Sequence, residues 1–221
     1  MKRVGLVLAL VVFCAMIVAA ADTPPLTPAS KVKMLGEPTV KDFPAMNAAT
    51  VLVKAADYAP EGGYAKGAEG VDKAYGSMMQ NGFGKLGKWM TESKVRPTGP
   101  AFGIFYEDPS VTEAAKLTAK LGFPVAADTK GVEGIKIEEL PAMPMAVSLT
   151  YEGAYQDASN AWDAVMKYIP EHHFEWAGPG MEIYHKGPGD TQNPQEYVTE
   201  IRVPVKKAAK PAAEGGRGPS K

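Results

Sequence analysis

The sequence predicts an α+β fold built from two pseudo-symmetric strand–helix–strand–strand repeats with a binding cleft between them. Three pairs of similar segments support this prediction, because they occur in the same order in both halves of the chain. Each half opens on an apolar residue followed by Pro-Ala-Met, continues to a strand that begins Gly-Pro, and closes on a strand that ends Pro-Val. The pairs are residues 40–46 and 137–143, 99–109 and 178–188, and 119–125 and 199–205.

Each repeat places a strand and then a helix between its opening and its Gly-Pro strand. β-Branched and apolar residues dominate 48–54 and 146–151, a composition typical of strands. In the second repeat, apolar residues recur every three or four positions from Ala158 to Ile169, which predicts a helix that ends at Pro170. The repeats cover about 40–125 and about 137–205.

The first repeat differs in its helix and in its length. A helix is expected over about 70–90, but an interior glycine costs up to about 1 kcal/mol, so we predict a break near Asn81-Gly82. Pro44 and Pro141 are 97 residues apart and Gly99 and Gly178 are 79 apart, so the first repeat carries 97 − 79 = 18 extra residues. We predict that they form a long loop, or a loop with a turn, around 58–64.

The N-terminus has the pattern of a targeting segment. Lys2 and Arg3 precede an apolar run that ends in three alanines before Asp22, which is typical of a cleaved signal peptide. The single cysteine, Cys14, lies in that run, so the mature chain would contain no disulfide. The alternative is an uncleaved membrane anchor, since about 18 apolar residues can span a bilayer. The expected parts are a signal peptide at 1–21, a linker at 22–36, a ligand-binding domain at 37–206 and a disordered basic tail at 207–221.

Composition excludes several function classes. The formal net charge of -1 gives no reason to expect binding to nucleic acid. His172, His173 and His185 lack the spacing of a metal site, so no metal or other cofactor is expected. If the signal peptide is cleaved, the protein would be periplasmic or secreted. If it is not cleaved, the N-terminal segment would attach the protein to the membrane, and no other membrane contact is expected. The expected partner is a small molecule, and the sequence does not define its identity or the oligomeric state.

One strand carries the candidate binding group. Residues alternate between the two faces of a strand, so Glu182 and Tyr184 share one face of the strand that follows Gly178-Pro179. When the repeats are aligned, Glu182 falls on Gly103 and Tyr184 on Phe105. One copy therefore has a carboxylate where the other has no side chain, which predicts a charged group in the cleft between the repeats.

The order, spacing and duplication of these motifs resemble the GyrI-like small-molecule-binding family, which serves as the effector-binding module of some AraC- and MerR-type regulators. The resemblance extends over about 40–205. It implies an α+β fold with a pseudo-twofold axis and a cleft on that axis. Members of this kind bind flat, often cationic aromatic molecules against a buried glutamate ringed by aromatic residues, and some relatives are hydrolases. Transcriptional control is not implied here, because the sequence shows no DNA-binding domain.

These arguments define a set of candidate ligand-binding residues. A buried carboxylate selects a poorly hydrated organic cation, and aromatic rings add about 0.5–2 kcal/mol per good cation–π contact. Glu200 is a second carboxylate, although a surface ion pair with Arg202 is the favoured interpretation. The set is Glu182, Tyr184, Phe105, Gly103, Tyr151, Tyr155, Trp162 and Glu200.

Three functions remain open on the sequence alone. The first is an exported, non-enzymatic protein that binds an aromatic or cationic amphipathic ligand. The second is a hydrolase acting on a small reactive compound in the same cleft, where Glu182 would act as general base or stabilise positive charge and Tyr184 would donate a hydrogen bond. The third is a haem-binding protein of the SOUL type, which is weakened because no histidine lies on a convincing apolar helix face.

Overall fold

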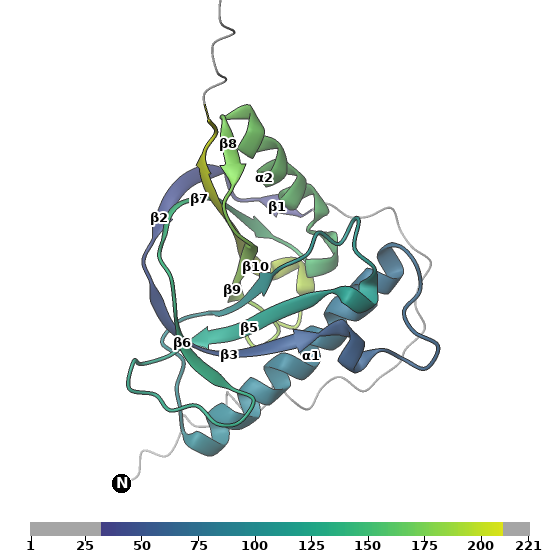
Figure 1. The fold of residues 1–221 in the computed structure, drawn as a ribbon, viewed down its shortest axis with the longest axis vertical. Helices are drawn as coiled ribbons and strands as arrows, with labels where there is room; N and C mark the ends of the chain where they lie inside the picture. Colours follow the sequence, from purple (N-terminus) through teal and green to yellow (C-terminus); the bar gives the residue numbers. More distant parts are fainter. Residues whose placement is uncertain (1–31, 210–221) are drawn as a thin grey trace, which may run out of the picture.

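A curled antiparallel sheet and two helices make up the protein (Figure 1). The computed structural model describes residues 32–209, and these form one ten-stranded sheet in the order β1-β7-β10-β9-β4-β5-β3-β6, with β2 paired to β7 and β8 to β10. The predicted α+β class is confirmed. The strands are β1 (Lys33–Met34), β2 (Thr39–Phe43), β3 (Met46–Lys54), β4 (Ala101–Phe105), β5 (Thr118–Pro124), β6 (Lys136–Leu140), β7 (Met143–Glu152), β8 (Phe174–Trp176), β9 (Gly180–Lys186) and β10 (Val198–Lys207); the helices are α1 (Ala68–Ser93) and α2 (Ser159–Glu171).

The two Gly-Pro strands pair with each other at the middle of the sheet. β4 runs antiparallel to β9, and the Cα of Gly103 lies opposite the Cα of Glu182. These two residues are also equivalents in the sequence repeat, so the pseudo-twofold axis passes between them. The predicted symmetry is therefore present, and it places Glu182 beside the axis.

The opening strand of each repeat belongs to the other half of the sheet. β2 pairs with β7, and β6 pairs with β3, so neither joins the strand that follows it in its own repeat. This exchange follows the same twofold symmetry, because each half donates one edge strand to its partner. It ties the halves together through backbone hydrogen bonds as well as through the β4–β9 pair.

Helix α1 is continuous over 26 residues, so the predicted break near Asn81-Gly82 is wrong. Gly82 faces the sheet, where an added Cβ would lie 2.6 Å from Leu121 Cδ1 and 3.0 Å from Val53 Cγ1. The glycine thus lets the helix approach β3 and β5 closely, and packing offsets its poor helix propensity. Gly76, Gly84 and Gly87 have open space where a Cβ would stand.

Most of the 18 extra residues of the first repeat lengthen a helix. α1 has 26 residues and α2 has 13, so 26 − 13 = 13 of the extra residues are helical. The prediction of a long loop, or of a loop with a turn, is wrong for that reason. The rest lie between β3 and α1, where Tyr64 anchors the segment by donating a hydrogen bond to the carbonyl of Ala55 at 2.9 Å.

The expected linker ends earlier than predicted. Val32 is buried against the core beneath α2, and its N–H donates to Asn160 Oδ1 at 3.1 Å. β1 then pairs with β7, so residues 32–36 join the folded part of the chain. The predicted signal segment, most of the linker and most of the basic tail lie outside the described residues. No helix within 32–209 has the length and apolarity that a bilayer crossing needs.

Both helices pack against the same face of the sheet and form two separate cores. One core joins α1 to β3 and β5, and the other joins α2 to β7 and β10. A third apolar cluster, which includes Phe102, Ile104, Met181 and Ile183, lies on the opposite face. The boundary between the two helical cores follows β4 and β9, and we call it the seam.

Candidate functional site

Glu182 interrupts a row of apolar side chains that crosses the helical face of the sheet. The register places six residues side by side across six strands, and all of them except Gly103 and Glu182 are aliphatic. At all the remaining positions of the row the two halves match, since each aliphatic residue has an aliphatic equivalent. The row is Val51, Leu121, Gly103, Glu182, Ile201 and Leu149.

The Glu182 carboxylate is buried and accepts hydrogen bonds from neutral donors. The indole Nε1 of Trp162 donates to Oε1 at 2.8 Å, and the Tyr184 hydroxyl donates to Oε2 at 3.1 Å. Only 9% of the residue is exposed. Burial raises the pKa of Glu182, although the hydrogen bonds from Trp162 and Tyr184 oppose that rise. The predicted charged group is thus held in an environment that disfavours its charge.

Two glycines make room for the donors of Glu182. An added Cβ at Gly180 would lie 2.7 Å from Cη2 of Trp162, so the indole from α2 rests directly on the β9 backbone. An added Cβ at Gly103 would lie 3.0 Å from the Tyr184 hydroxyl oxygen and 3.1 Å from Cζ of Phe105. Tyr184 and Phe105 therefore occupy the space that a side chain at Gly103, opposite Glu182, would otherwise fill.

A chain of aromatic rings runs along the seam from one half to the other. Phe83 of α1 contacts Phe123 and Tyr184 edge to face, with ring centroids 5.7 and 6.0 Å apart. Tyr184 contacts Tyr155 at 5.4 Å, and Tyr155 contacts Tyr197 at 4.9 Å. Tyr184 joins this chain of rings to Glu182, because its hydroxyl donates to the carboxylate.

Tyr151 and Tyr75 complete the surroundings of the carboxylate. Burial raises the pKa of each phenol, and the nearby charge of Glu182 adds to the effect in both cases. Tyr75 of α1 also meets Phe105 edge to face at 5.4 Å. The seam thus gathers seven of the eight predicted residues: Glu182, Tyr184, Phe105, Gly103, Tyr151, Tyr155 and Trp162.

Glu200 lies elsewhere, on the opposite face of the sheet. It is 6% exposed, so its predicted surface ion pair with Arg202 is instead a buried one. Its carboxylate accepts from Arg202 at 2.6 Å, Ser148 at 2.7 Å and His185 at 3.1 Å. Burial opposes ionisation, but these three hydrogen bonds outweigh it and lower the pKa of Glu200. The two glutamates cannot share a ligand on one face, because adjacent strand positions point to opposite sides.

The three histidines do not converge. His172 stacks on Tyr168 at 3.7 Å between ring centroids, and His185 contacts Glu200 on the other sheet face. His173 has a positive φ of 58° at the turn into β8. Within residues 32–209, no three histidine, cysteine or acidic side chains gather as a metal site would need.

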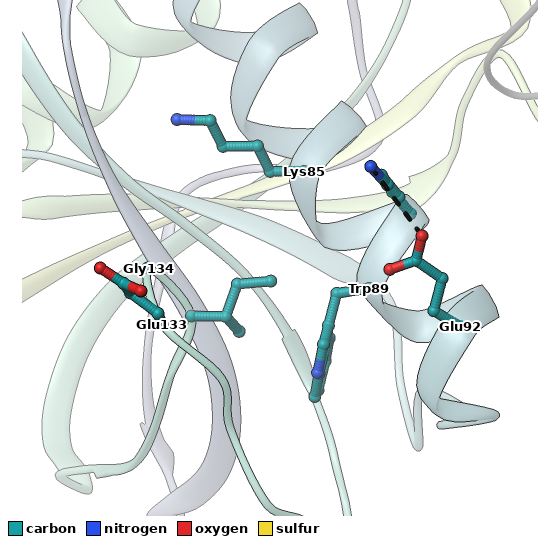
Figure 2. A pocket seen from close by; sticks show the side chains of 7 residues that line it. Lys85, Trp89, Glu92, Glu133 and Gly134 are labelled. Atoms are coloured by element: carbon teal, nitrogen blue, oxygen red, sulfur yellow. Dashed lines mark ion pairs between the residues drawn. The ribbon is translucent and has the colours of Figure 1, made fainter.

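A surface pocket of about 270 Å³ lies between α1 and the turn before β6 (Figure 2). Trp89 and Ile135 line it among charged side chains, and Glu92 pairs there with Lys88 at 3.9 Å. It includes none of the predicted site residues. Its lining residues are Lys85, Lys88, Trp89, Glu92, Glu133, Gly134 and Ile135.

The sequence of this chain matches the family model of the GyrI-like small molecule binding domain over residues 36–206. The chain belongs to this family. The match includes both repeats, the seam and Glu182. No curated protein matches the sequence.

Several solved structures share this GyrI-like fold. The EcmrR C-terminal domain matches with a TM-score of 0.63 and 18% identity, over 79% of this chain and 100% of that one. This chain spans 58% of the length of EcmrR in its DNA complex. A hydrolase encoded by lin2189 from Listeria innocua matches with a TM-score of 0.52 and 13% identity, over 77% of this chain and 92% of that one. SAV2435 bound to tetraphenylphosphonium matches with a TM-score of 0.51 and 13% identity, over 77% and 94%. Identities this low establish the fold alone.

The sequence analysis missed the contribution of α1 to the site of this GyrI-like domain. Tyr75 and Phe83 both reach the seam, and Met79 lies midway between them in sequence. A spacing of four residues keeps side chains on one helix face, so this stripe was visible in the sequence. The stripe was not recognised because the helix was predicted to break near Gly82, which lies within the stripe.

Proposed function

We propose that this protein binds small aromatic cations in the seam, with Glu182 as the counter-charge. The observation that carries the proposal is a buried carboxylate without a cationic partner. Its hydrogen-bond donors are Trp162 and Tyr184, both neutral, and it forms no ion pair among residues 32–209. An unpaired buried charge is costly, and a bound cation would remove that cost.

The surroundings of Glu182 favour a particular kind of cation. Leaving water costs a delocalised organic cation less than a metal ion or an ammonium group, so a dry site selects the former. Aromatic faces from both halves, including Trp162, Tyr155 and Phe83, suit a flat ring. SAV2435, which has the same fold, is bound to tetraphenylphosphonium, an aromatic cation, and this supports the proposal by analogy.

A matched pair of ligands tests the proposal directly. N-Methylquinolinium and 1-methylnaphthalene have nearly the same shape and differ in charge. The wild-type protein should bind the cation more tightly, measured by calorimetry and by quenching of tryptophan fluorescence. Glu182→Gln keeps the shape of the side chain and should weaken cation binding by about 10- to 150-fold, while leaving the neutral ligand unaffected.

A control variant and a pH series complete the test. Glu138→Gln removes a carboxylate from the other face of the sheet and should change neither affinity. Cation binding should release a proton and weaken as the pH falls, because the ligand lowers the raised pKa of Glu182. Equal losses for both ligands in Glu182→Gln would mean that the carboxylate only shapes the site, and no loss would place the site elsewhere.

A hydrolase is the second candidate function. The contact that favours it is the hydrogen bond from the Tyr184 hydroxyl to Glu182 Oε2, which pairs a donor with a potential general base. The fold is shared with a hydrolase from Listeria innocua. If the seam catalyses hydrolysis, Tyr184→Phe should abolish turnover while retaining ligand affinity. Unchanged turnover in that variant would reject the role of Tyr184.

We also propose that the protein acts outside the cytoplasm. Lys2 and Arg3, the apolar run after them and the alanines before Asp22 support export through a cleaved signal peptide. The proposal predicts that sequencing of the protein from its native compartment begins at Asp22. A retained Met1 would favour the membrane-anchored alternative.

A further inference from the structure

The surface pocket between α1 and the turn before β6 is separate from the seam. Its lining residues on α1 are at positions 85, 88, 89 and 92, and the others are residues 133–135 of the turn. None of them belongs to the chain of aromatic rings that includes Tyr184. Because α1 reaches the seam through Tyr75 and Phe83, it borders the seam and this pocket with different residues. The pocket is thus available to a ligand of its own.

Trp89 and Ile135 give the pocket an apolar wall and a hydrogen-bond donor. Trp89 is 4% exposed and Ile135 is 7% exposed, and both belong to the core beneath α1. The indole Nε1 of Trp89 is buried and has no hydrogen-bond partner within residues 32–209. A buried N–H without an acceptor is costly and uncommon in a folded protein. An acceptor on a bound molecule would remove that cost.

The charges around the pocket leave one sign unpaired on each side. On α1, Lys88 and Glu92 pair with each other at 3.9 Å. The remaining charge on α1 is Lys85, whose Nζ donates to the neutral hydroxyl of Tyr58 at 3.3 Å. On the turn, Glu133 forms no ion pair within the described part of the chain. The helix side of the pocket is therefore positive and the turn side negative.

The pocket suits a small ligand with two ends of opposite charge. Its volume of about 270 Å³ lies just below the usual range of about 300–1,000 Å³ for ligand pockets. Lys85 and Trp89 lie one helical turn apart on α1, and Glu133 lies on the facing turn (Figure 2). A ligand with a cationic group and an anionic acceptor would therefore find a partner for each.

We propose that this pocket binds a free α-amino acid with an apolar side chain, such as leucine. The apolar side chain packs on Trp89 and Ile135. The carboxylate accepts a hydrogen bond from Trp89 Nε1 on the side of Lys85, and the ammonium group lies at Glu133. This site is independent of the function proposed for the seam, because it uses no residue of the seam.

The indole N–H groups report on the two sites separately. The chain contains three tryptophans, Trp89, Trp162 and Trp176, whose indole resonances in proton–nitrogen correlation NMR are assigned by substitution with phenylalanine. L-Leucine should move the Trp89 proton resonance downfield, because a new hydrogen bond deshields the proton, and should leave the Trp162 resonance in place. N-Methylquinolinium should move the Trp162 resonance instead, since that indole donates to Glu182 in the seam.

Two analogues of leucine each lack one charged group. 4-Methylpentanoate has no ammonium group, and 3-methylbutylamine has no carboxylate. Glu133→Gln should weaken leucine binding by about two- to fivefold, the range for an exposed ion pair, and leave the affinity for 4-methylpentanoate unchanged. Trp89→Phe should weaken leucine binding by about three- to tenfold, the range for one hydrogen bond, and leave the affinity for 3-methylbutylamine unchanged.

Glu139→Gln is the matched control. Glu139 is an exposed glutamate on β6 that does not line the pocket, so the substitution makes the same change of charge elsewhere. It should leave the affinity for leucine unchanged. Because Glu133 is exposed on a turn, Glu133→Gln should fold like the wild type and tests the site even if Trp89→Phe unfolds.

The opposite results reject the site. If saturating leucine leaves the Trp89 resonance in place, the pocket does not bind amino acids. If leucine moves the Trp162 resonance, it binds in the seam instead. Equal losses for leucine and 4-methylpentanoate in Glu133→Gln would reject the ammonium contact, and equal losses for leucine and 3-methylbutylamine in Trp89→Phe would reject the carboxylate contact. None of these results affects the cation site at Glu182, which the response to N-methylquinolinium tests separately.

Discussion

Replacing Glu182 with glutamine should stabilise the folded protein at neutral pH and have no effect at low pH. The glutamine amide can keep both neighbours of the carboxylate as partners, with its oxygen accepting from Trp162 Nε1 and its NH₂ group donating to the Tyr184 hydroxyl oxygen in a reversed hydrogen bond. The substitution therefore removes a buried charge and little else. Glu182→Leu also removes the charge, but it leaves the indole N–H and the hydroxyl without acceptors.

The expected magnitude follows from these contacts. A buried charge that is only partly compensated by neutral donors costs about 1–3 kcal/mol, so Glu182→Gln should raise the free energy of unfolding by that amount above the folded-state pKa. Two unpaired donors cost about 1–3 kcal/mol each, so Glu182→Leu should gain less than Glu182→Gln or lose stability outright.

The pH dependence has a definite sign. Burial raises the pKa of Glu182 above its ordinary value of 4.5 in the folded state. The contribution of this group to stability is fully present below the unfolded-state pKa and is lost as the pH rises through the folded-state pKa. The wild type and Glu182→Gln should thus be equally stable near pH 4, and the difference should grow as the pH rises.

Urea unfolding at a series of pH values, followed by circular dichroism, measures this difference. The other titrating groups are common to both proteins, so their effects cancel in the comparison. A difference that is constant with pH would show that the pKa of Glu182 is the same in the folded and unfolded states, which would refute the raised pKa. A variant that is less stable than the wild type at every pH would refute the claim that the carboxylate lacks a cationic partner.

Two further predictions concern the rest of the fold. Gly82→Ala should lower stability by about 1–3 kcal/mol, because the added Cβ would press on Leu121 and Val53. Gly87→Ala, on the open side of the same helix, should raise stability by about 0.5–1 kcal/mol. Thermal melts compare the two variants, and a stabilised Gly82→Ala would contradict the close packing of α1. Although burial opposes its ionisation, hydrogen bonds from Lys120, Lys136 and Thr50 lower the pKa of Glu138 to about 2. The contribution of Glu138 to the free energy of unfolding should therefore be lost as the pH falls from about 4.5 toward 2. Glu138→Gln should be less stable than the wild type by about 1–2 kcal/mol at pH 7 and equally stable near pH 2. A stability difference that does not change with pH would contradict this.

The sequence by itself determined the repeat, the fold class and the residues of the seam that lie on strands. Alternation along 178–188 placed Glu182 and Tyr184 on one face, and alignment of the repeats placed Glu182 against Gly103. These properties depend on the order of residues within a few positions, so local periodicity and internal comparison reveal them.

Only the tertiary structure decided which distant segments meet. β2 and β6 cross to the opposite halves, Gly82 fits beneath Leu121, and Tyr75 and Phe83 reach the seam from a helix that the glycines appeared to interrupt. Glu200 follows the same alternation as its neighbours, yet its burial depends on three partners 2, 15 and 52 residues away. Packing energy is shared among residues remote in sequence, so it overrides local propensity and cannot be read from a single strand or helix.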